Sequence, residues 1–293
     1  MINFVNLLVG LLIGTFIVGS IYSLIAVGLS MLLSTVGLLN FAHGALLAVG
    51  AYASWYFTLK TGSPALMLIG FPILFLLGIT SDKLFFKKIR YKPNSTGRLM
   101  LLTTTLAVVI EQILNITFGG VRRKIPTIIK GGISMGDIVI NNNHILISAI
   151  AIITIILLYF ILTRTVTGIA IRAVGQNIEE SLIVGVNVEL IYTITVGIGF
   201  ALAGLAGTLL GSMYIFNAAF GRHPLFIGYI IVVLGGLGNI KGTLYASFMV
   251  AIIEQLSYLI LGGSWGIAAP FLSMVIILII RPYGLFGLKE EVR

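Results

Sequence analysis

Two polar pairs, Glu111-Gln112 and Glu254-Gln255, lie inside long apolar stretches, where an ionisable side chain is costly. Carboxylates in such positions commonly mark a substrate path or a proton relay. In both cases six residues separate the pair from two consecutive glycines, at Gly119-Gly120 and Gly262-Gly263. The two patterns lie roughly half the chain apart, as an internal duplication of the kind found in transporters would place them. A chance match, or a glutamate that reaches the membrane interface or a glutamine partner, is the alternative explanation.

No motif for metal, covalent or nucleotide chemistry accompanies these glutamates. His43, His144 and His223 have no second histidine or carboxylate three or four residues further on, and the chain has no cysteine. We interpret the histidines as hydrogen-bonding residues near the membrane interface; a catalytic dyad assembled only in the fold is the alternative. The segment Gly238-Asn-Ile-Lys-Gly-Thr243 has Lys before Gly, whereas a phosphate-binding loop ends in Gly-Lys-Ser/Thr. We therefore expect no cofactor in this chain; if the protein is an ATP-driven pump, another chain binds the ATP and Mg²⁺.

The composition requires a lipid environment. Hydrophobic residues make up 58% of the 293 residues, the mean hydropathy is +1.13, and the charged residues are 18 basic and 9 acidic ones. A soluble chain carries charge on about a quarter of its residues, so disordered, fibrous and nearly all soluble enzyme classes are excluded. The net charge of +9 does not indicate nucleic acid, because the basic residues lie in short gaps between apolar runs. The N-terminus lacks the basic segment and cleavage site of a signal peptide, so we expect its first apolar segment to be retained.

Apolar runs long enough for membrane helices follow one another along the chain, since about 20 residues cross the hydrocarbon. They predict an all-α polytopic membrane protein of about 8–10 transmembrane or re-entrant helices in a single domain, residues 1–293. The candidate spans are Val5–Ser34, Phe41–Phe57, Ala65–Ser81, Leu99–Phe118, His144–Thr163, Ile191–Ile215, Leu225–Ile240, Thr243–Leu261 and Gly266–Ile280.

The distribution of basic residues predicts the orientation. Asp82–Arg98 contains six of them and should be cytoplasmic, which places the loop 119–143 outside and the loop 164–190 inside. The tail Arg281–Arg293 is then also cytoplasmic. Arg122–Lys124 falls on the outer side and disagrees with the rule.

Glycine occurs 35 times, which is unusual for ordinary helices. Gly10 and Gly14, and likewise Gly207 and Gly211, have the spacing that allows helices to approach closely, and we expect it to serve packing within the chain. The segments Asn40–Gly44 and Gly235–Asn239 interrupt apolar runs, as discontinuous helices that line a pathway do. Their backbone groups must then be satisfied by protein or water, and tight turns with an asparagine cap are the alternative reading.

The loop 164–190 contains the most specific local pattern. Asn177 is followed three residues later by Glu180, which has the form of a helix N-cap with a reciprocal acidic partner, and Gly185 can end the helix. The pattern predicts a short helix on the cytoplasmic face. Because two helical turns are marginal alone, a docking partner would explain its presence.

These segments, taken together, resemble the permeases of the branched-chain amino acid ABC importers, on the side of the H-type (LivH-like) subunit. The resemblance covers nearly the whole chain through five ordered motifs: Gly19–Leu29 with Asn40–Gly44 and Gly50–Tyr52, Arg172–Gly185, Ala203–Gly207, Val233–Asn239 and Arg281–Gly287. The chain departs from the family at Glu180-Ser181, commonly an alanine pair, and at Asn239–Lys241, commonly Ser-Ile-Pro. These departures leave the substrate open, because permeases for urea and short amides share the motifs.

The resemblance implies the ABC importer permease fold in a bacterial inner membrane. It also implies a second permease (LivM-like), two ATP-binding subunits and an extracytoplasmic substrate-binding protein, with no ATPase site in this chain. The residues expected to couple to the ATPase are Gly175, Asn177, Glu179, Glu180, Ser181 and Gly185. The residues expected to line the translocation pathway are Asn40, His43, Glu111, Gln112, Glu254 and Gln255. A membrane-bound transferase that uses His43 and a buried glutamate, and a passive channel, are the competing classes.

Overall fold

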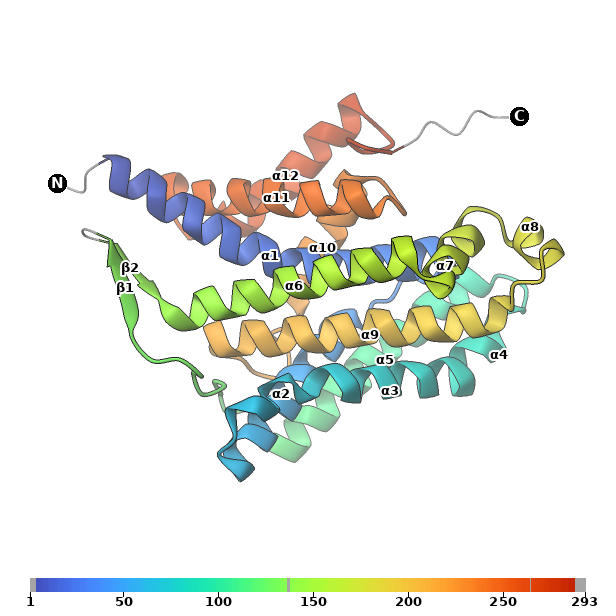
Figure 1. Ribbon diagram of the computed structural model, residues 1–293, viewed down its shortest axis with the longest axis horizontal. Coiled ribbons are helices and arrows are strands. Elements are labelled where there is room, and N and C mark those ends of the chain that lie inside the picture. The colour runs from blue at the N-terminus through green and yellow to red at the C-terminus, as the bar shows by residue number, and fades with distance from the viewer. Residues whose placement is uncertain (1–3, 136–137, 264, 288–293) are drawn as a thin grey trace.

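The computed structural model describes residues 4–135, 138–263 and 265–287, and in this part the chain forms a bundle of long helices (Figure 1). Residues 288–293 of the predicted cytoplasmic tail lie outside the described residues. The helices are α1 (Phe4–Val36), α2 (His43–Thr61), the 3-10 turn η1 (Pro64–Ile69), α3 (Gly70–Ser81), the π-turn η2 (Asp82–Phe86), α4 (Lys87–Arg90), α5 (Ser95–Phe118), α6 (Asn142–Arg164), α7 (Val166–Gln176), α8 (Ile178–Ile183), α9 (Val188–Met213), α10 (Arg222–Gly235), α11 (Ile240–Leu261) and α12 (Trp265–Ile280).

The helices confirm the prediction of a polytopic membrane protein. Among the described residues, six helical segments are long and apolar enough to cross a membrane: Asn6–Val36, Leu66–Arg90, Ser95–Phe118, Asn142–Arg164, Val188–Met213 and Ile240–Leu261. The shorter apolar helices α10 and α12, and the buried helix α2, account for the other predicted spans.

Three predicted loops contain more regular structure than expected. The helix that begins in α3 continues through η2 and α4 to Arg90, so the connection predicted to be cytoplasmic starts at Tyr91 and not at Asp82. The loop 119–143 contains an antiparallel hairpin of β1 (Gly132–Met135) and β2 (Ile138–Asn141). The loop 164–190 holds α7 as well as the predicted short helix α8.

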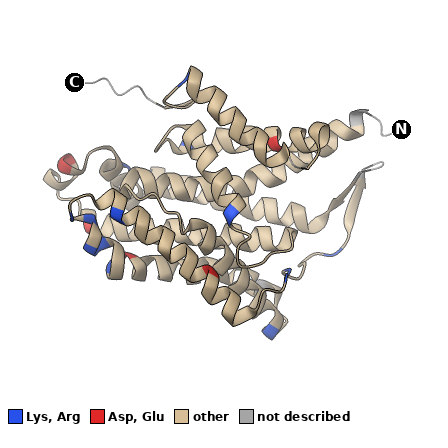
Figure 2. Ribbon diagram, turned by 180° about the vertical axis from the view of Figure 1, so that it is seen from behind, with Lys and Arg blue, Asp and Glu red and all other residues tan. Residues whose placement is uncertain are grey.

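The two ends of the bundle differ in charge. The hairpin and the start of α1 lie at one end, which we call the hairpin end, while α4 and α8 lie at the other (Figure 1). Figure 2 shows blue Lys and Arg ribbons gathered at the end that holds α4 and α8, which we call the basic end. The last described residues also lie at the basic end, where the Leu285 N–H donates to the Leu234 carbonyl.

The central helix is α9, which is 89% buried over its most apolar window and packs on α1, α2 and α3. Its glycines bring backbones into direct contact. A Cβ atom at Gly207 would lie 1.9 Å from the Leu47 carbonyl oxygen of α2, and one at Gly204 would lie 2.6 Å from the Gly70 oxygen of α3. Gly50 of α2 meets Gly204 in the same way, so three helices share one seam of small residues.

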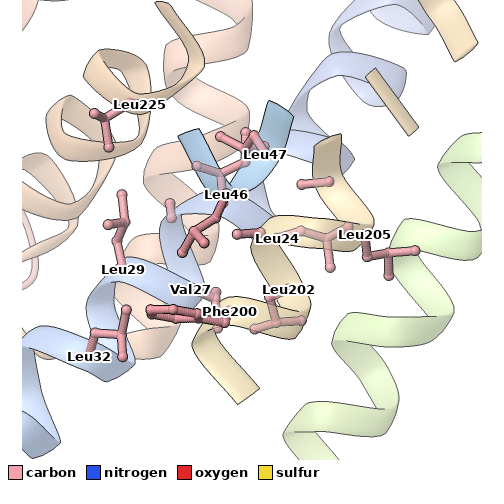
Figure 3. Close-up of a cluster of buried hydrophobic side chains, with 14 of the residues drawn as sticks. Leu24, Val27, Leu29, Leu32, Leu46, Leu47, Phe200, Leu202, Leu205 and Leu225 are labelled. Carbon is pink, nitrogen blue, oxygen red and sulfur yellow. The ribbon is translucent and has the colours of Figure 1, made fainter. Parts of the chain in front are cut away.

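Larger side chains fill the remaining space beside this seam. The buried cluster in Figure 3 draws on α1, α2, α9 and α10, with Leu24, Val27, Leu29, Leu32, Leu46, Leu47, Phe200, Leu202, Leu205 and Leu225 labelled. The expectation that Gly207 and Gly211 serve packing within the chain is confirmed, because both face α2.

Arg123, one of the basic residues on the unexpected side, is part of the structure of the hairpin end. Its guanidinium lies 4.0 Å from the ring centroid of Trp55, and Nη2 donates to the Phe118 carbonyl at 2.7 Å. Its backbone pairs with Phe216 in an isolated antiparallel bridge. A charge used in this way is compatible with the predicted orientation.

We predict that Gly207→Ala destabilises the protein, whereas Gly97→Ala does not. The first substitution forces two backbones apart, which costs about 1–3 kcal/mol or more, while a Cβ at Gly97 meets open space. The measurement is the temperature at which the purified protein loses its monodisperse size-exclusion peak. Equal melting of the two variants would contradict the proposed packing role of the seam.

Candidate functional site

The short helix α8 begins and ends where the sequence predicts. The Asn177 side chain accepts hydrogen bonds from the N–H groups of Glu179 (3.0 Å) and Glu180 (3.2 Å), so it caps the helix. At the other end Gly185 has φ +82°, and the N–H of Val186 donates to the Ser181 carbonyl at 3.0 Å. The left-handed glycine and this bond form the C-terminal motif that stops a helix. Both ends are therefore determined by local chemistry.

One part of the predicted cap is wrong. We expected the Glu180 carboxylate to accept from the Asn177 N–H, but this N–H donates to the Ala173 carbonyl of α7 at 2.9 Å. The backbone continues directly from α7 into α8, so the donor that a reciprocal acid would satisfy is already used. The side chain of Glu180 is left exposed.

The surface of α8 combines acids and apolar residues. Glu179 and Glu180 are exposed, and so are Ile183 (84%) and Val184 (76%) at the end of the helix. Ser181 is buried and its hydroxyl donates to the Asn177 carbonyl at 2.7 Å. The six predicted coupling residues thus belong to one continuous segment with an apolar tip that faces away from the bundle.

Two open cavities flank α8 at the basic end. One has a volume of about 440 Å³ and lies between the end of α1 and the junction of α7 and α8, with Ser34, Gly175 and Glu179 in its wall. The other, about 460 Å³, is lined by Arg90, Leu182 and Glu189. The short helix is therefore attached through its two connections more than through close packing.

A cluster of charged residues ties α4 to the start of α9 beside these cavities. Arg90 forms an ion pair with Asp82, whose Oδ2 accepts from the Thr193 hydroxyl at 2.7 Å. Glu189 accepts from the Tyr91 hydroxyl and lies 3.4 Å from Lys87 Nζ. We call Asp82, Arg90, Glu189 and Thr193 the basic-end clamp.

Sequence reasoning missed this clamp. Asp82 and Arg90 stand in the segment interpreted as a loop, where charges are expected to be solvated. In the structure Asp82 is fully buried and the Arg90 side chain is 8% exposed, because the helix continues and carries both to α9. The only sequence signal was a lone acid at the end of an apolar run.

Near the hairpin end, Glu111 of α5 pairs with Arg222, the first residue of α10. Arg222 Nε lies 3.0 and 3.2 Å from the two carboxylate oxygens, and Nη2 also donates to Glu111. The bond joins residues 111 positions apart, so no local pattern could have indicated Arg222. Glu111 is buried, whereas the Arg222 side chain is 65% exposed.

The predicted segment Asn40–Gly44 lies at the start of α10 as well. Asn40 and His43 are fully buried, and the Asn40 amide oxygen accepts from the Ala42 N–H at 3.1 Å. The Thr103 hydroxyl of α5 accepts from the Phe41 N–H at 3.3 Å, so protein groups satisfy this non-helical backbone. Gly44 and Gly221 touch, since a Cβ at Gly221 would lie 1.9 Å from the Gly44 oxygen.

The remaining pathway candidates are placed elsewhere. Glu254 is buried on α11, and the Tyr22 phenol of α1 is its polar neighbour. Gln255 lies against Gly14 of α1, where a Cβ would be 3.3 Å from its amide oxygen. Gln112 is exposed, whereas Glu111 beside it is buried. The structure therefore groups Asn40, His43 and Glu111 around the start of α10 and does not bring the six residues together.

The second glycine-interrupted segment belongs to the basic end. Gly238 faces Ser34 of α1, and Asn239 caps α11 by accepting from the Gly242 N–H at 3.0 Å. The Asn239 amide also donates to the Phe286 carbonyl at 2.8 Å, which attaches the end of the described chain. Here the alternative reading, a turn with an asparagine cap, describes the geometry.

The histidines do not form a site in the part of the chain that the structure describes. No group of three or more His, Asp or Glu side chains there could hold a metal ion. His43 is enclosed in the core near Gly28, so its side chain does not lie on an exposed surface of the chain. His43 is the first residue of α2, and the first turn of this helix lies inside the bundle.

The sequence matches one protein family over most of its length. The model of the family described as branched-chain amino acid transport system / permease component covers residues 11–280. The permease protein BraD of the high-affinity branched-chain amino acid transport system of Pseudomonas aeruginosa is 27% identical over 93% of this chain and 94% of its own. The corresponding LivH protein of Escherichia coli K12 is 25% identical over 93% of each chain. A probable LivH permease of Methanocaldococcus jannaschii is 26% identical over 94% of this chain and 91% of its own. No solved structure matches the chain.

We predict that Gly185→Val lowers transport at least tenfold, while Gly185→Asn lowers it less than threefold. Asparagine tolerates the left-handed conformation that Gly185 adopts, whereas a β-branched residue does not, so only valine reshapes the end of α8. The measurement is substrate uptake by cells, normalised to the amount of the chain in the membrane. Full uptake with Gly185→Val would contradict the predicted coupling role of α8.

We predict that Arg90→Gln destabilises the protein by about 3–5 kcal/mol, because it leaves the buried Asp82 carboxylate without its cation. The double variant Asp82→Asn/Arg90→Gln should lose less than half as much, since no unpaired charge remains. Thermal unfolding of the two variants provides the comparison. A loss in the double variant as large as that in Arg90→Gln would show that the two residues do not act as a pair.

Proposed function

The chain belongs to the family of branched-chain amino acid transport permease components, and we propose that it is one of two transmembrane subunits of an ATP-driven importer for branched-chain amino acids. The multi-pass helical body and the family match along residues 11–280 support the permease assignment. The proposed partners are a second, LivM-like permease, two ATP-binding subunits that hold ATP and Mg²⁺, and an extracytoplasmic substrate-binding protein. No cofactor is proposed for this chain itself.

The observation that carries the proposal is the exposed, doubly capped helix α8 at the basic end. Six residues of helix with an apolar tip gain little stability alone, so a docking partner accounts for their position. We assign the segment around Gly175, Asn177, Glu179, Glu180, Ser181 and Gly185 to contact with an ATP-binding subunit. The excess of Lys and Arg at the same end favours a cytoplasmic location for α8 and for the C-terminus, with the hairpin outside.

In this proposal, closure of the ATPase pair displaces α8 and the displacement passes into α9. Only Val184–Asn187 separates the two helices, and the basic-end clamp joins the start of α9 to α4. Since α9 packs directly on α1, α2 and α3, a shift at its cytoplasmic end moves packed helices as bodies. The cavities beside α8 supply room for such a movement.

The proposed pathway runs past the start of α10, near Asn40, His43 and Glu111. The charge of Glu111 is balanced by Arg222, and the buried segment before α2 adds further polar groups. Gln112, Glu254 and Gln255 remain proposed pathway residues outside this region. Gln112 lies on the exposed face of α5, and Glu254 and Gln255 lie between α11 and α1. A pathway that all of these residues line would require the helices between them to rearrange during transport.

We predict that the reconstituted transporter, with its binding protein, takes up leucine, isoleucine and valine only in the presence of hydrolysable ATP. Unlabelled isoleucine and valine should inhibit leucine uptake at least tenfold when in 100-fold excess, while urea and acetamide should not. The measurement is accumulation of labelled leucine in proteoliposomes.

Each alternative function predicts a different result when the same proteoliposomes are tested. Uptake of urea or acetamide in place of the amino acids would indicate a permease for short amides. Equilibration without ATP would indicate a passive channel. Chemical conversion of a lipid-linked substrate without any transport would indicate a membrane-bound transferase.

A further inference from the structure

The ion pair between Glu111 and Arg222 lies within the membrane-spanning part of the chain. Glu111 stands seven residues before the end of α5, which places it roughly 10 Å from the hairpin end of that helix. Its carboxylate is bound side-on by the Arg222 guanidinium. A pair of full charges at this depth is expensive and is retained mainly where it has a use.

The surroundings of the pair are apolar and exposed on one side. Val108, one turn before Glu111 on α5, is 54% exposed, and Phe226, one turn after Arg222 on α10, is 64% exposed. The Arg222 side chain itself is 65% exposed. A guanidinium that faced hydrocarbon would be strongly unfavourable, so this face must border a water-containing path or a second subunit.

Glu254, which occurs in the same local sequence pattern, provides an internal comparison. Glu111 and Glu254 occupy equivalent positions, each seven residues before a helix end at a glycine with positive φ, Gly119 and Gly262. Within the described residues, Glu111 has a cation as its partner and Glu254 has the phenol of Tyr22. The cation is therefore not a requirement of this sequence pattern, and its presence at Glu111 needs a separate explanation.

We propose that Glu111 and Arg222 form a binding site for the charged backbone of a free amino acid during its passage, a site that rests on the proposed importer function. Arg222 takes the substrate carboxylate, Glu111 takes the ammonium group, and the apolar substrate side chain lies along Val108 and Phe226. The start of α10 adds a favourable field for the carboxylate, because Arg222 is the first residue of that helix.

Charge balance is the physical reason for this assignment. The free pair is neutral and the substrate is a neutral zwitterion, so the exchange of one ion pair for two leaves no charge unpaired at any stage. Because guanidinium and carboxylate groups form charge-assisted hydrogen bonds to complementary ions, both substrate charges are satisfied in a medium of low polarity. Urea or a short amide has no such charges and gains nothing from the pair.

The test is binding of leucine by the complete permease–ATPase complex in lipid nanodiscs, with the binding protein omitted. Saturation-transfer difference NMR detects weak binding, and three probes are compared: leucine, leucinamide, which lacks the carboxylate, and 4-methylpentanoate, which lacks the ammonium group. We expect a leucine signal at least threefold above that of either analogue. Equal signals from all three probes would overturn the site, and this comparison needs no variant.

The double variant Glu111→Gln/Arg222→Gln removes both charges without leaving one unpaired. We expect it to lose the leucine signal and at least 90% of leucine uptake, while Lys60→Gln, which removes an exposed cation of the hairpin end, keeps both within twofold. Uptake by the double variant within twofold of the unmodified complex, or an equal loss in Lys60→Gln, would refute the site. If the unmodified complex transports no branched-chain amino acid at all, the importer function itself is wrong. If the unmodified complex transports leucine and the double variant does so equally well, the function stands and this site is refuted.

Discussion

The close approach of backbones along α9 is the constraint on which the rest of the structure depends. In lipid, apolar side chains gain little by turning toward one another, so helices associate through tight packing of small residues. Gly50, Gly70, Gly204 and Gly207 bring α2, α3 and α9 together at distances that no Cβ atom would allow. Between them, the hydroxyls of Ser54 and Thr208 share a hydrogen bond of 2.7 Å, which satisfies polar groups without adding bulk. The helices that carry functional residues take their positions from this seam.

Three charged groups among the described residues have well-defined partners, and the kind of partner differs with position. At the basic end, Asp82 is buried against Arg90 and Thr193, and this contact attaches α4 to α9. At the hairpin end, the Arg123 guanidinium lies over the Trp55 ring and donates to the Phe118 carbonyl at the end of α5. Of the three, Arg222 combines a buried carboxylate partner with a largely exposed side chain. A site for a charged ligand requires a charged side chain that has a partner on one side and is accessible on the other, as Arg222 is. Asp82 and Arg90 are buried against each other and leave no accessible side for a ligand.

The helix α8 and the body around α9 differ in how densely they are packed. The segment at α8 is defined by Asn177 and Gly185, with open space on both sides, so it can move while its ends remain intact. The body around α9 is densely packed and moves, if at all, as a unit. A soft contact surface attached to a stiff helix suits a part that receives a displacement and transmits it, and this physical contrast supports the proposed coupling role.

The sequence by itself determined the features that depend on neighbours within a few residues. The apolar runs predicted the long helices, because spanning lipid requires them, and Asn177 and Gly185 predicted the limits of α8, because capping bonds reach only two to five residues. The clamp, the pairing of Glu111 with Arg222, the depth of His43 and the separation of Glu254 from Glu111 were decided by tertiary structure alone. The Asp82–Thr193 and Glu111–Arg222 bonds join residues 111 positions apart, and such partners are chosen by which helices pack together. Glu111 and Glu254 occur in the same local pattern, yet one meets a guanidinium and the other a phenol, because Glu111 of α5 reaches the first residue of α10, whereas Glu254 lies on α11, which packs along α1, the helix that carries Tyr22.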